Sequence, residues 1–304
     1  GSSPCGGTKF MKRKLRNFIS YLKTNYNYLK HKEVKPSHLF YGQMQPARAV
    51  EMLSTLNEQI EKFQSQFGEE QFVFVEIGSY LGESLKLYGN NIDKKLKNYL
   101  IISIDPYSPD AIHEGNKIVD QINVPKEMKI SVHHSKPWSS PAETKKIISK
   151  IYHYFINNIS NYSFKDKHMH LRMKSENGFS LLKKLNIKID FCYIDGSHYY
   201  EGIKNDYNNF NSILRKDKSY EGCICGDDYE LDLNKIKNYF NYTKEEFLEF
   251  LKNNKNVDYI VLNTKDGVNK KNRIGFHPAT TLFFSETQDT IIKSGSGFWK
   301  KDKT

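Results

Sequence analysis

The sequence predicts an α/β fold in which helices cover both faces of a mainly parallel β-sheet. Short apolar runs rich in β-branched and aromatic residues alternate with longer stretches of helical periodicity, a pattern typical of strand–helix–strand units. The first of these runs, at residues 71–77, is short and largely apolar, as expected for a strand that is buried on both faces. The last two runs have no helix between them, which favours an antiparallel pair at the sheet edge. A chain of 304 residues is long enough to bury the core of one large domain.

The first 68 residues differ in texture from the rest of the chain. Residues 1–10 are expected to form a flexible leader. Residues 11–68 are expected to form an N-terminal helical extension, because apolar side chains recur at helical spacing between Ala47 and Phe63. The start of this extension is strongly basic, so we expect it to contact an anionic partner or a second copy of the chain. Such a contact would build a homo-oligomer through the N-terminal helices.

Residues 69–288 hold the alternating segments and are expected to form the main domain. Strand-like runs lie at residues 71–77, 99–104, 168–173, 189–194, 221–225, 257–262 and 280–285. Helical patterns lie between them, at residues 83–91, 143–158, 179–185, 200–214 and 233–253. The irregular segment 106–141 is too long for an ordinary connection, so we expect a functional insertion such as a lid. Residues 289–304 are expected to form a tail.

Composition narrows the class of protein. The 46 Lys and Arg residues against 35 Asp and Glu give a formal net charge of +11, which fits either an anionic partner or a Lys-rich surface. No apolar run is long enough to span a membrane, and no secretion signal is apparent. Four cysteines make no disulfide framework. A cytoplasmic location without a membrane partner is therefore expected.

A glycine-containing turn follows the first strand and is the first candidate binding site. The sequence there runs Glu76-Ile77-Gly78-Ser79-Tyr80-Leu81-Gly82-Glu83-Ser84. Two glycines let the backbone approach a ligand, but the spacing is not G-x-G-x-x-G and the strand-terminal acid would repel a pyrophosphate. We expect a cationic or hydroxyl-bearing ligand, held by Glu76, Gly78, Ser79, Gly82 and Ser84. The alternative is an ordinary tight turn without a ligand.

The next two strand ends supply Asp105 and Ser175. A carboxylate at the end of the second strand can accept both hydroxyls of a ribose, as in nucleotide-binding folds. Ser175 is placed to meet an adenine edge. An Asp before a proline is otherwise a turn former, so the assignment of Asp105 depends on its pairing with the glycine turn. Three further residues are expected in loops at the sheet edge where the carboxyl ends of the strands meet, which we call the rim: Tyr80, Tyr107 and His277. The sequence does not rank them as substrate contacts.

Acidic residues gather at two later strand ends. Asp195 follows the strand at residues 189–194, and Asp227 and Asp228 follow the strand at residues 221–225. These strands should be neighbours, and carboxylates that converge on one rim need a proton or a cation to offset their repulsion. Oxygen ligands without cysteine predict a hard ion, Mg²⁺. The alternative is a solvated turn and helix cap at the Asp-Asp pair.

His198 stands three residues after Asp195, at the start of the next predicted helix. An imidazole at this rim could take a proton from a substrate hydroxyl as a general base. The alternative is an ordinary surface histidine. We therefore expect His198 and Asp195 to be the catalytic residues.

Together these segments resemble the class I S-adenosylmethionine-dependent methyltransferases. The stretch from Ile189 to His198, with Gly226-Asp227-Asp228-Tyr229, is similar to the small-molecule O-methyltransferase branch that contains the macrocin O-methyltransferases, with cephalosporin-hydroxylase-like proteins as relatives. The resemblance covers about Phe72 to Ser285. It implies a Rossmann-like, doubly wound seven-stranded sheet whose last strand is antiparallel. It also implies S-adenosylmethionine as the cofactor.

The resemblance carries roles to particular residues. The first glycine turn and Asp105 match the cofactor motif and its ribose-binding acid, and Asp195 joins them as a cofactor contact. The matching acids, Asp195, Asp227 and Asp228, hold Mg²⁺ in that branch, and the histidine matching His198 is a proposed base. The expected reaction is methyl transfer to a hydroxyl of a small polar molecule, such as a sugar or a natural-product glycoside.

Two other functions remain open from the sequence. The basic charge would suit an RNA methyltransferase, but ribose methylation commonly uses a Lys base, whereas this rim offers Asp and His, so a nucleic-acid partner is not expected. The second is a non-catalytic binding protein that keeps the nucleotide fold.

Overall fold

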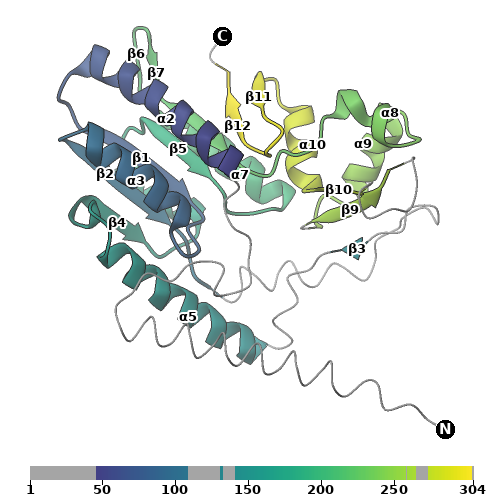
Figure 1. Ribbon diagram of the computed structural model, residues 1–304, viewed down its shortest axis with the longest axis horizontal. Coiled ribbons are helices and arrows are strands. Elements are labelled where there is room, and N and C mark those ends of the chain that lie inside the picture. The colour runs from purple at the N-terminus through teal and green to yellow at the C-terminus, as the bar shows by residue number, and fades with distance from the viewer. Residues whose placement is uncertain (1–45, 109–130, 133–140, 258, 265–272, 303–304) are drawn as a thin grey trace.

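The structure is a computed structural model that describes residues 46–108, 131–132, 141–257, 259–264 and 273–302 (Figure 1). The predicted leader, the extension before residue 46 and most of the predicted lid at residues 106–141 lie outside the described residues.

A seven-stranded sheet forms the centre of the protein, in the order β11-β12-β8-β5-β1-β2-β4. Its strands are β1 (Phe72–Ile77), β2 (Tyr99–Ile104), β4 (His168–Leu171), β5 (Phe191–Ile194), β8 (Cys223–Gly226), β11 (Ile291–Lys293) and β12 (Trp299–Lys301). The five strands from β8 to β4 run parallel, whereas β12 pairs antiparallel with β8. The predicted sheet of seven strands with an antiparallel last strand is therefore confirmed.

Helices cover both faces of this sheet because its strands bury apolar side chains on both sides. One face packs against α2 (Pro46–Phe67), α3 (Glu83–Lys95) and α5 (Pro141–Ser160), and the other against α6 (Ser175–Lys184), α7 (Tyr200–Ser212) and α10 (Pro278–Glu286). Side chains alternate along β1, so that Phe72 and Phe74 join the first layer while Val73 and Val75 join the second. This arrangement is the predicted doubly wound fold.

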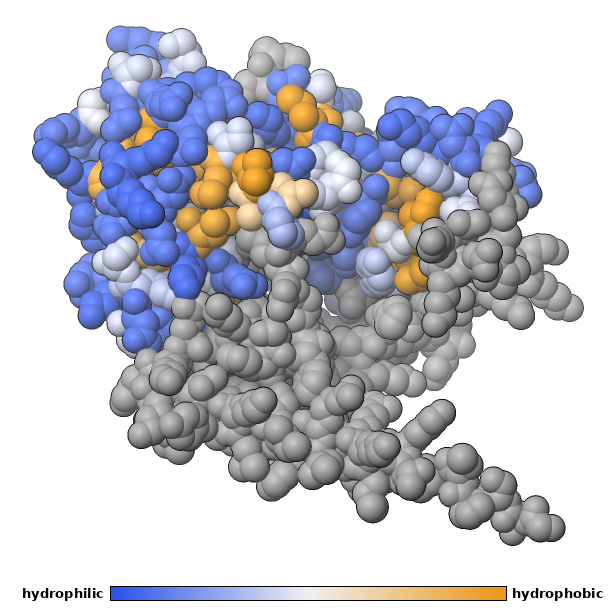
Figure 2. Space-filling model, in the orientation of Figure 1, coloured by the Kyte–Doolittle hydropathy of each residue, from blue (hydrophilic) through white to orange (hydrophobic). Residues whose placement is uncertain are grey.

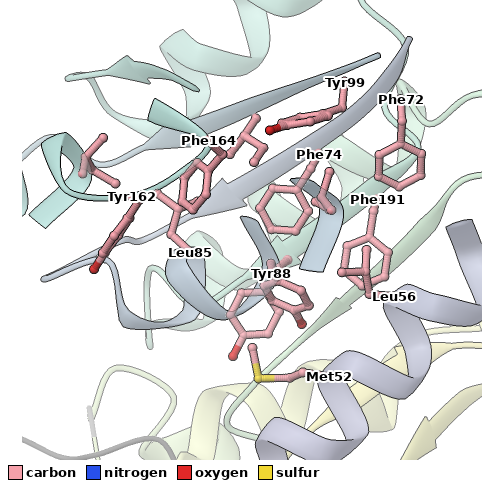
Figure 3. Packing of buried hydrophobic residues seen from close by; sticks show 14 of the residues in the cluster. Met52, Leu56, Phe72, Phe74, Leu85, Tyr88, Tyr99, Tyr162, Phe164 and Phe191 are labelled. Atoms are coloured by element: carbon pink, nitrogen blue, oxygen red, sulfur yellow. The ribbon is translucent and has the colours of Figure 1, made fainter. Parts of the chain in front are cut away.

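Helix α2 is an integral layer of the domain. Its residues Met52, Leu56, Ile60 and Phe63 recur at helical spacing and are fully buried. Figure 3 shows Met52 and Leu56 beside the aromatic side chains of the sheet and of α3. The predicted helix within the N-terminal extension is confirmed for these residues, and it packs on the sheet together with α3.

The final pair of strands differs from the prediction. Residues 280–285, expected to form a strand, lie in helix α10, which Pro278 opens at a first-turn position where proline is favoured. A short run that is buried on nearly all sides gives no periodicity to separate a helix from a strand, and nearly the whole of α10 is buried. The antiparallel edge comes instead from β11 and β12, within residues 289–304 that were expected to form a tail. Trp299, which is 2% exposed, anchors β12 in the core.

The chain between β8 and α10 forms most of a small subdomain, which is seen at the right of Figure 1. The helix expected at residues 233–253 is divided into a short turn, α8 (Ile236–Tyr239) and α9 (Lys244–Asn253), because Thr243 and Glu246 form a capping box that starts a new helix. β9 (Ile260–Asn263) pairs antiparallel with β10 (Arg273–Phe276) and with β3 (Ser131–Val132). The run predicted at 257–262 therefore belongs to a second sheet. A separate hairpin joins β6 (Lys216–Asp217) and β7 (Tyr220–Glu221).

The face of the protein drawn in Figure 2 is hydrophilic over most of its described part, with apolar side chains gathered near the centre and at the right of the view. Among the described residues, no helix combines the length and the apolar character that a membrane span requires.

Candidate active site

The glycine turn after β1 is built for a close backbone approach. Gly78 has a φ of +81°, and a Cβ atom there would lie 1.9 Å from the carbonyl oxygen of Asp195 at the end of β5. Gly82 has a φ of +79° and begins α3. Both positions require glycine, because other residues are strained at such angles and Gly78 has no room for a side chain. The turn and the predicted catalytic acid are thus in direct contact through the backbone.

Glu76 lies fully buried beside this turn. Its Oε1 accepts a 2.6 Å hydrogen bond from the Ser84 hydroxyl, and its Oε2 has no hydrogen-bond partner of good geometry among the described residues. Burial raises the pKa of Glu76 to about 8. A buried carboxyl with one uncommitted oxygen fits a cationic or hydroxyl-bearing ligand, which is what the sequence predicts here.

Asp105 holds the glycine turn from the neighbouring strand end. Its Oδ2 accepts the backbone amides of Ser79 and Tyr80 at 2.9 and 3.2 Å, and its Oδ1 accepts the amide of Tyr107 at 2.9 Å. The Tyr107 hydroxyl in turn donates to the carbonyl oxygen of Tyr80 at 2.8 Å. A carboxylate offers about four acceptor positions, so one remains beyond these three amides. Asp105 therefore orders the turn, while ribose binding stays a prediction.

Ser175 is the first residue of α6, just beyond the end of β4. Its hydroxyl hydrogen-bonds the buried carboxyl of Asp206 on α7, whose pKa burial raises to about 7. Sequence reasoning did not identify Asp206, because nothing in the local pattern separates it from the polar face of α7. The proposed contact of Ser175 with adenine stays a prediction.

The three predicted acids meet at one rim. β5 and β8 are parallel neighbours, with Ile194 paired to Gly226, so the residues that follow them are brought side by side. Oxygen atoms of Asp195, Asp227 and Asp228 lie within 4.8 Å of one another. Burial and the charge of Asp228 raise the pKa of Asp195 to about 6. Burial and the same charge also raise the pKa of Asp227.

Two histidines flank Asp228. The Nε2 atom of His198 lies 3.0 Å from Asp228 Oδ2, and the Nδ1 atom of His277 lies 3.4 Å from Asp228 Oδ1. Their rings lie 4.6 Å apart, centre to centre. Burial opposes the charge of Asp228, but the two imidazoles hold the pKa of that carboxyl below its usual range. Asp195 and His198 thus both lie close to Asp228, while their catalytic role stays a prediction.

His277 lies between β10 and α10 and contacts Glu230. Its Nδ1 lies 2.8 Å from Oε1 of Glu230, and its backbone amide donates to Oε2 of the same residue at 3.1 Å. Burial opposes a charged imidazole here, yet Asp228 and Glu230 together raise the pKa of His277. The sequence placed His277 near the rim without ranking it, because its partners come from a different part of the chain.

An arginine that the sequence did not identify completes the rim. Arg48, in the first turn of α2, forms an ion pair with Asp227. The sequence gives no local signal for this contact, because 179 residues separate the two side chains (227 − 48).

The rim fits the two groups that the resemblance implies. The glycine turn and the uncommitted Glu76 oxygen suit a cofactor that carries positive charge and hydroxyls, and the converging carboxylate oxygens suit a hard divalent cation.

A family comparison identifies the domain. The family whose sequence model matches this chain is described as a methyltransferase domain, and the match runs over residues 75–229, just over half of the chain. The chain belongs to this methyltransferase family. The matched part of the methyltransferase domain begins in β1 and ends just after Asp228, so it contains the glycine turn and all three acids. Arg48 and His277 lie outside it.

Individual proteins similar to this methyltransferase domain are distant. An uncharacterized protein of Acanthamoeba polyphaga mimivirus is 28% identical over 171 residues, which are 56% of this chain and 58% of that protein. The chain thus spans little more than half the length of that relative.

Two solved methyltransferases are also similar. The S-adenosylhomocysteine-bound PaMTH1 of Podospora anserina is 12% identical with a TM-score of 0.39, over 99% of this chain and 97% of that one. CalS11, a TDP-rhamnose 3'-O-methyltransferase of calicheamicin biosynthesis, is 11% identical with a TM-score of 0.36, over 76% of this chain and 81% of that one.

Proposed function

We propose that this S-adenosylmethionine-dependent methyltransferase transfers the methyl group to a hydroxyl of a small polar acceptor, such as a sugar or a natural-product glycoside, with the help of Mg²⁺. One observation carries the proposal. Gly78 of the glycine turn lies against the backbone of Asp195. The carboxylate of Asp195 lies near that of Asp228, which in turn contacts His198. A bound cofactor would therefore lie next to a group able to accept a proton.

The residues of the turn would bind and orient the cofactor. Glu76 offers its uncommitted oxygen, and Asp105 fixes the amides of Ser79 and Tyr80. When bound, S-adenosylmethionine would supply a methyl group on a positively charged sulfur: the acceptor oxygen would bond to the methyl carbon as the carbon–sulfur bond breaks, and neutral S-adenosylhomocysteine would leave. Holding the acceptor in line with this methyl group can lower the barrier by several kcal/mol.

His198 would take the proton of the acceptor hydroxyl. Its Nε2 hydrogen-bonds Asp228 Oδ2, so in the neutral ring the lone pair is on Nδ1 and that atom is the base. Asp228 fixes the ring orientation and stabilises the imidazolium that results. Asp195, Asp227 and Asp228 would hold Mg²⁺, which lowers the pKa of a hydroxyl bound to it.

The test uses the full chain with S-adenosylmethionine and a panel of sugars, nucleotide sugars and glycosides, with mass spectrometry to detect a gain of one methyl group. We expect product in the presence of Mg²⁺, loss of most of the activity in EDTA, and a fall of at least about 100-fold for His198→Gln. Asp232→Asn, an acid in the loop before α8, is the matched control and should keep full activity.

Different results would refute O-methylation, the use of Mg²⁺ and the choice of a small acceptor. Transfer to a nitrogen or carbon acceptor alone would refute O-methylation. Asp228→Asn with full activity in EDTA would remove Mg²⁺ from the reaction. Steep loss of transfer to RNA with rising salt, with no small acceptor used, would favour an RNA substrate instead.

A further inference from the structure

Arg48 brings a fixed positive charge into the acidic rim from a distant part of the chain. Besides the ion pair with Asp227, its Nε and Nη2 atoms donate to the carbonyl oxygen of Ser296 at 3.3 and 3.2 Å. The side chain of Asp227 is only 3% exposed, and that of Arg48 is 19% exposed. This is a largely dehydrated pair, held at both ends of the guanidinium.

Asp227 is held from several sides. Its Oδ1 accepts the backbone amide of Asp228 at 2.7 Å, and its carbonyl oxygen accepts the indole N–H of Trp299 at 2.8 Å. Gly297 has a φ of +89°, and a Cβ atom there would lie 3.1 Å from Asp227 Oδ1. The turn between β11 and β12 therefore packs closely over the ion pair.

Glu51, three residues after Arg48 on helix α2, contacts the same turn between β11 and β12. Glu51 accepts hydrogen bonds on Oε2 from the hydroxyls of Ser294, at 2.6 Å, and Ser296. Glu51 and Arg48 lie on one side of α2 because residues three apart are neighbours on a helix. We call the set Arg48, Glu51, Asp227, Ser294 and Ser296 the clasp. It joins the first helix of the described chain, the end of β8 and the last hairpin.

The clasp and a metal ion would both use the carboxylate of Asp227. Arg48 interacts electrostatically with Asp227, Asp195 and Asp228, the three side chains whose oxygens converge. A divalent cation that coordinates Asp227 would meet the guanidinium that already pairs with this carboxylate. The two positive charges would repel strongly, because little water separates them at this buried position.

We propose that Arg48 competes with the divalent cation for Asp227, so that cation binding opens the clasp and cation release closes it. This inference rests on the metal site of the proposed function and adds a residue that lies outside the matched methyltransferase domain. Arg48 keeps the three acids together without a metal, at the expense of metal affinity. The rim is thereby coupled to α2 and to the β11–β12 turn.

The first test is the affinity for Mn²⁺, measured on the full chain by calorimetry and by the paramagnetic signal of free Mn²⁺. Arg48→Gln should bind Mn²⁺ at least about tenfold more tightly than the wild type, because a nearby positive charge is lost. Arg215→Gln is the matched control, since Arg215 pairs with the buried Asp190 at the opposite end of β5 and its loss should leave Mn²⁺ affinity unchanged.

The second test follows metal binding in a chain that keeps Arg48, so its main result does not depend on how Arg48→Gln folds. Trp138→Phe leaves Trp299 as the only tryptophan of the chain, and Trp299 donates to Asp227. Mn²⁺ and Mg²⁺ should both change its fluorescence, with the midpoints found by calorimetry. The change should be much smaller in the double variant with Arg48→Gln, because the clasp is already open.

Several results would overturn the inference. Unchanged or weaker Mn²⁺ binding by folded Arg48→Gln would show that the arginine supports the metal site or has no effect on it. Metal binding without a change at Trp299 would show that the clasp stays closed. No metal binding by either protein would refute both this inference and the Mg²⁺ site, whereas S-adenosylhomocysteine binding in the same samples tests the cofactor site separately.

Discussion

Glu76 gives the sharpest prediction, because one substitution separates stability from cofactor binding. Burial raises its pKa from 4.5 to about 8, so between these values the folded chain keeps a proton that the unfolded chain releases. The free energy of unfolding therefore falls as the pH rises through this window. At 1.36 kcal/mol per pKa unit, the free energy of unfolding at pH 7 is lower than at pH 4 by about 3 kcal/mol. Above pH 8 the decrease levels off at about 5 kcal/mol.

Glu76→Gln removes this pH-dependent loss, because the amide is neutral at every pH and its oxygen can still accept the Ser84 hydroxyl. The variant should match the wild type near pH 4 and exceed its free energy of unfolding by about 3 kcal/mol at pH 7. Affinity for S-adenosylmethionine at pH 7 should fall about tenfold, because the side-chain amide would leave a donor group of the bound cofactor without its acceptor.

Urea unfolding at pH 4, 7 and 8.5, followed by circular dichroism, measures the stability difference, and calorimetry measures the affinity. Glu61→Gln, at an exposed position of α2, is the control and should change neither quantity. Equal stability of the wild type and Glu76→Gln at every pH would refute the reasoning, because it would mean that Glu76 is not buried as a neutral group.

Two further predictions concern the turn and helix α2. Gly78→Ala should lower the affinity for S-adenosylhomocysteine, measured by calorimetry, more than about tenfold, because a Cβ atom there meets the carbonyl oxygen of Asp195. The control Gly295→Ala should bind with normal affinity, because nothing lies within 4 Å of the added atom. Normal affinity in both variants would contradict the close approach at Gly78. Leu56→Ala should lower the free energy of unfolding, measured in urea, by about 2–5 kcal/mol, because Leu56 is fully buried. Val50 is 68% exposed on the same helix, so Val50→Ala should change this free energy by less than about 0.5 kcal/mol. Equal effects of the two substitutions would mean that α2 is not part of the core.

The sequence predicted the parts of the fold that depend on local patterns. The central strands were found because most of them are short runs dominated by apolar residues, as in Phe72–Ile77 and Tyr99–Ile104. The last part of the sheet was missed for the opposite reason. β11 and β12 are three residues long and rich in lysine, and only their pairing and the burial of Trp299 define them.

The candidate site followed a similar division. Residues at the ends of strands could be named, because parallel strands bring their carboxyl ends to one edge and so bring Asp195, Asp227 and Asp228 together. Arg48 and His277 could not be named, because their contacts join segments that are far apart in the chain. The second role of Asp105, holding the glycine turn through backbone amides, is also visible only in three dimensions.

The most direct test of the central claim is calorimetric titration of S-adenosylmethionine into the full chain, beside Gly78→Ala. We expect one molecule to bind per wild-type chain and binding to the variant to be greatly weakened, because the proposed cofactor site includes the turn that contacts Asp195. Absence of binding to the wild type, or equal binding to both proteins, would contradict it.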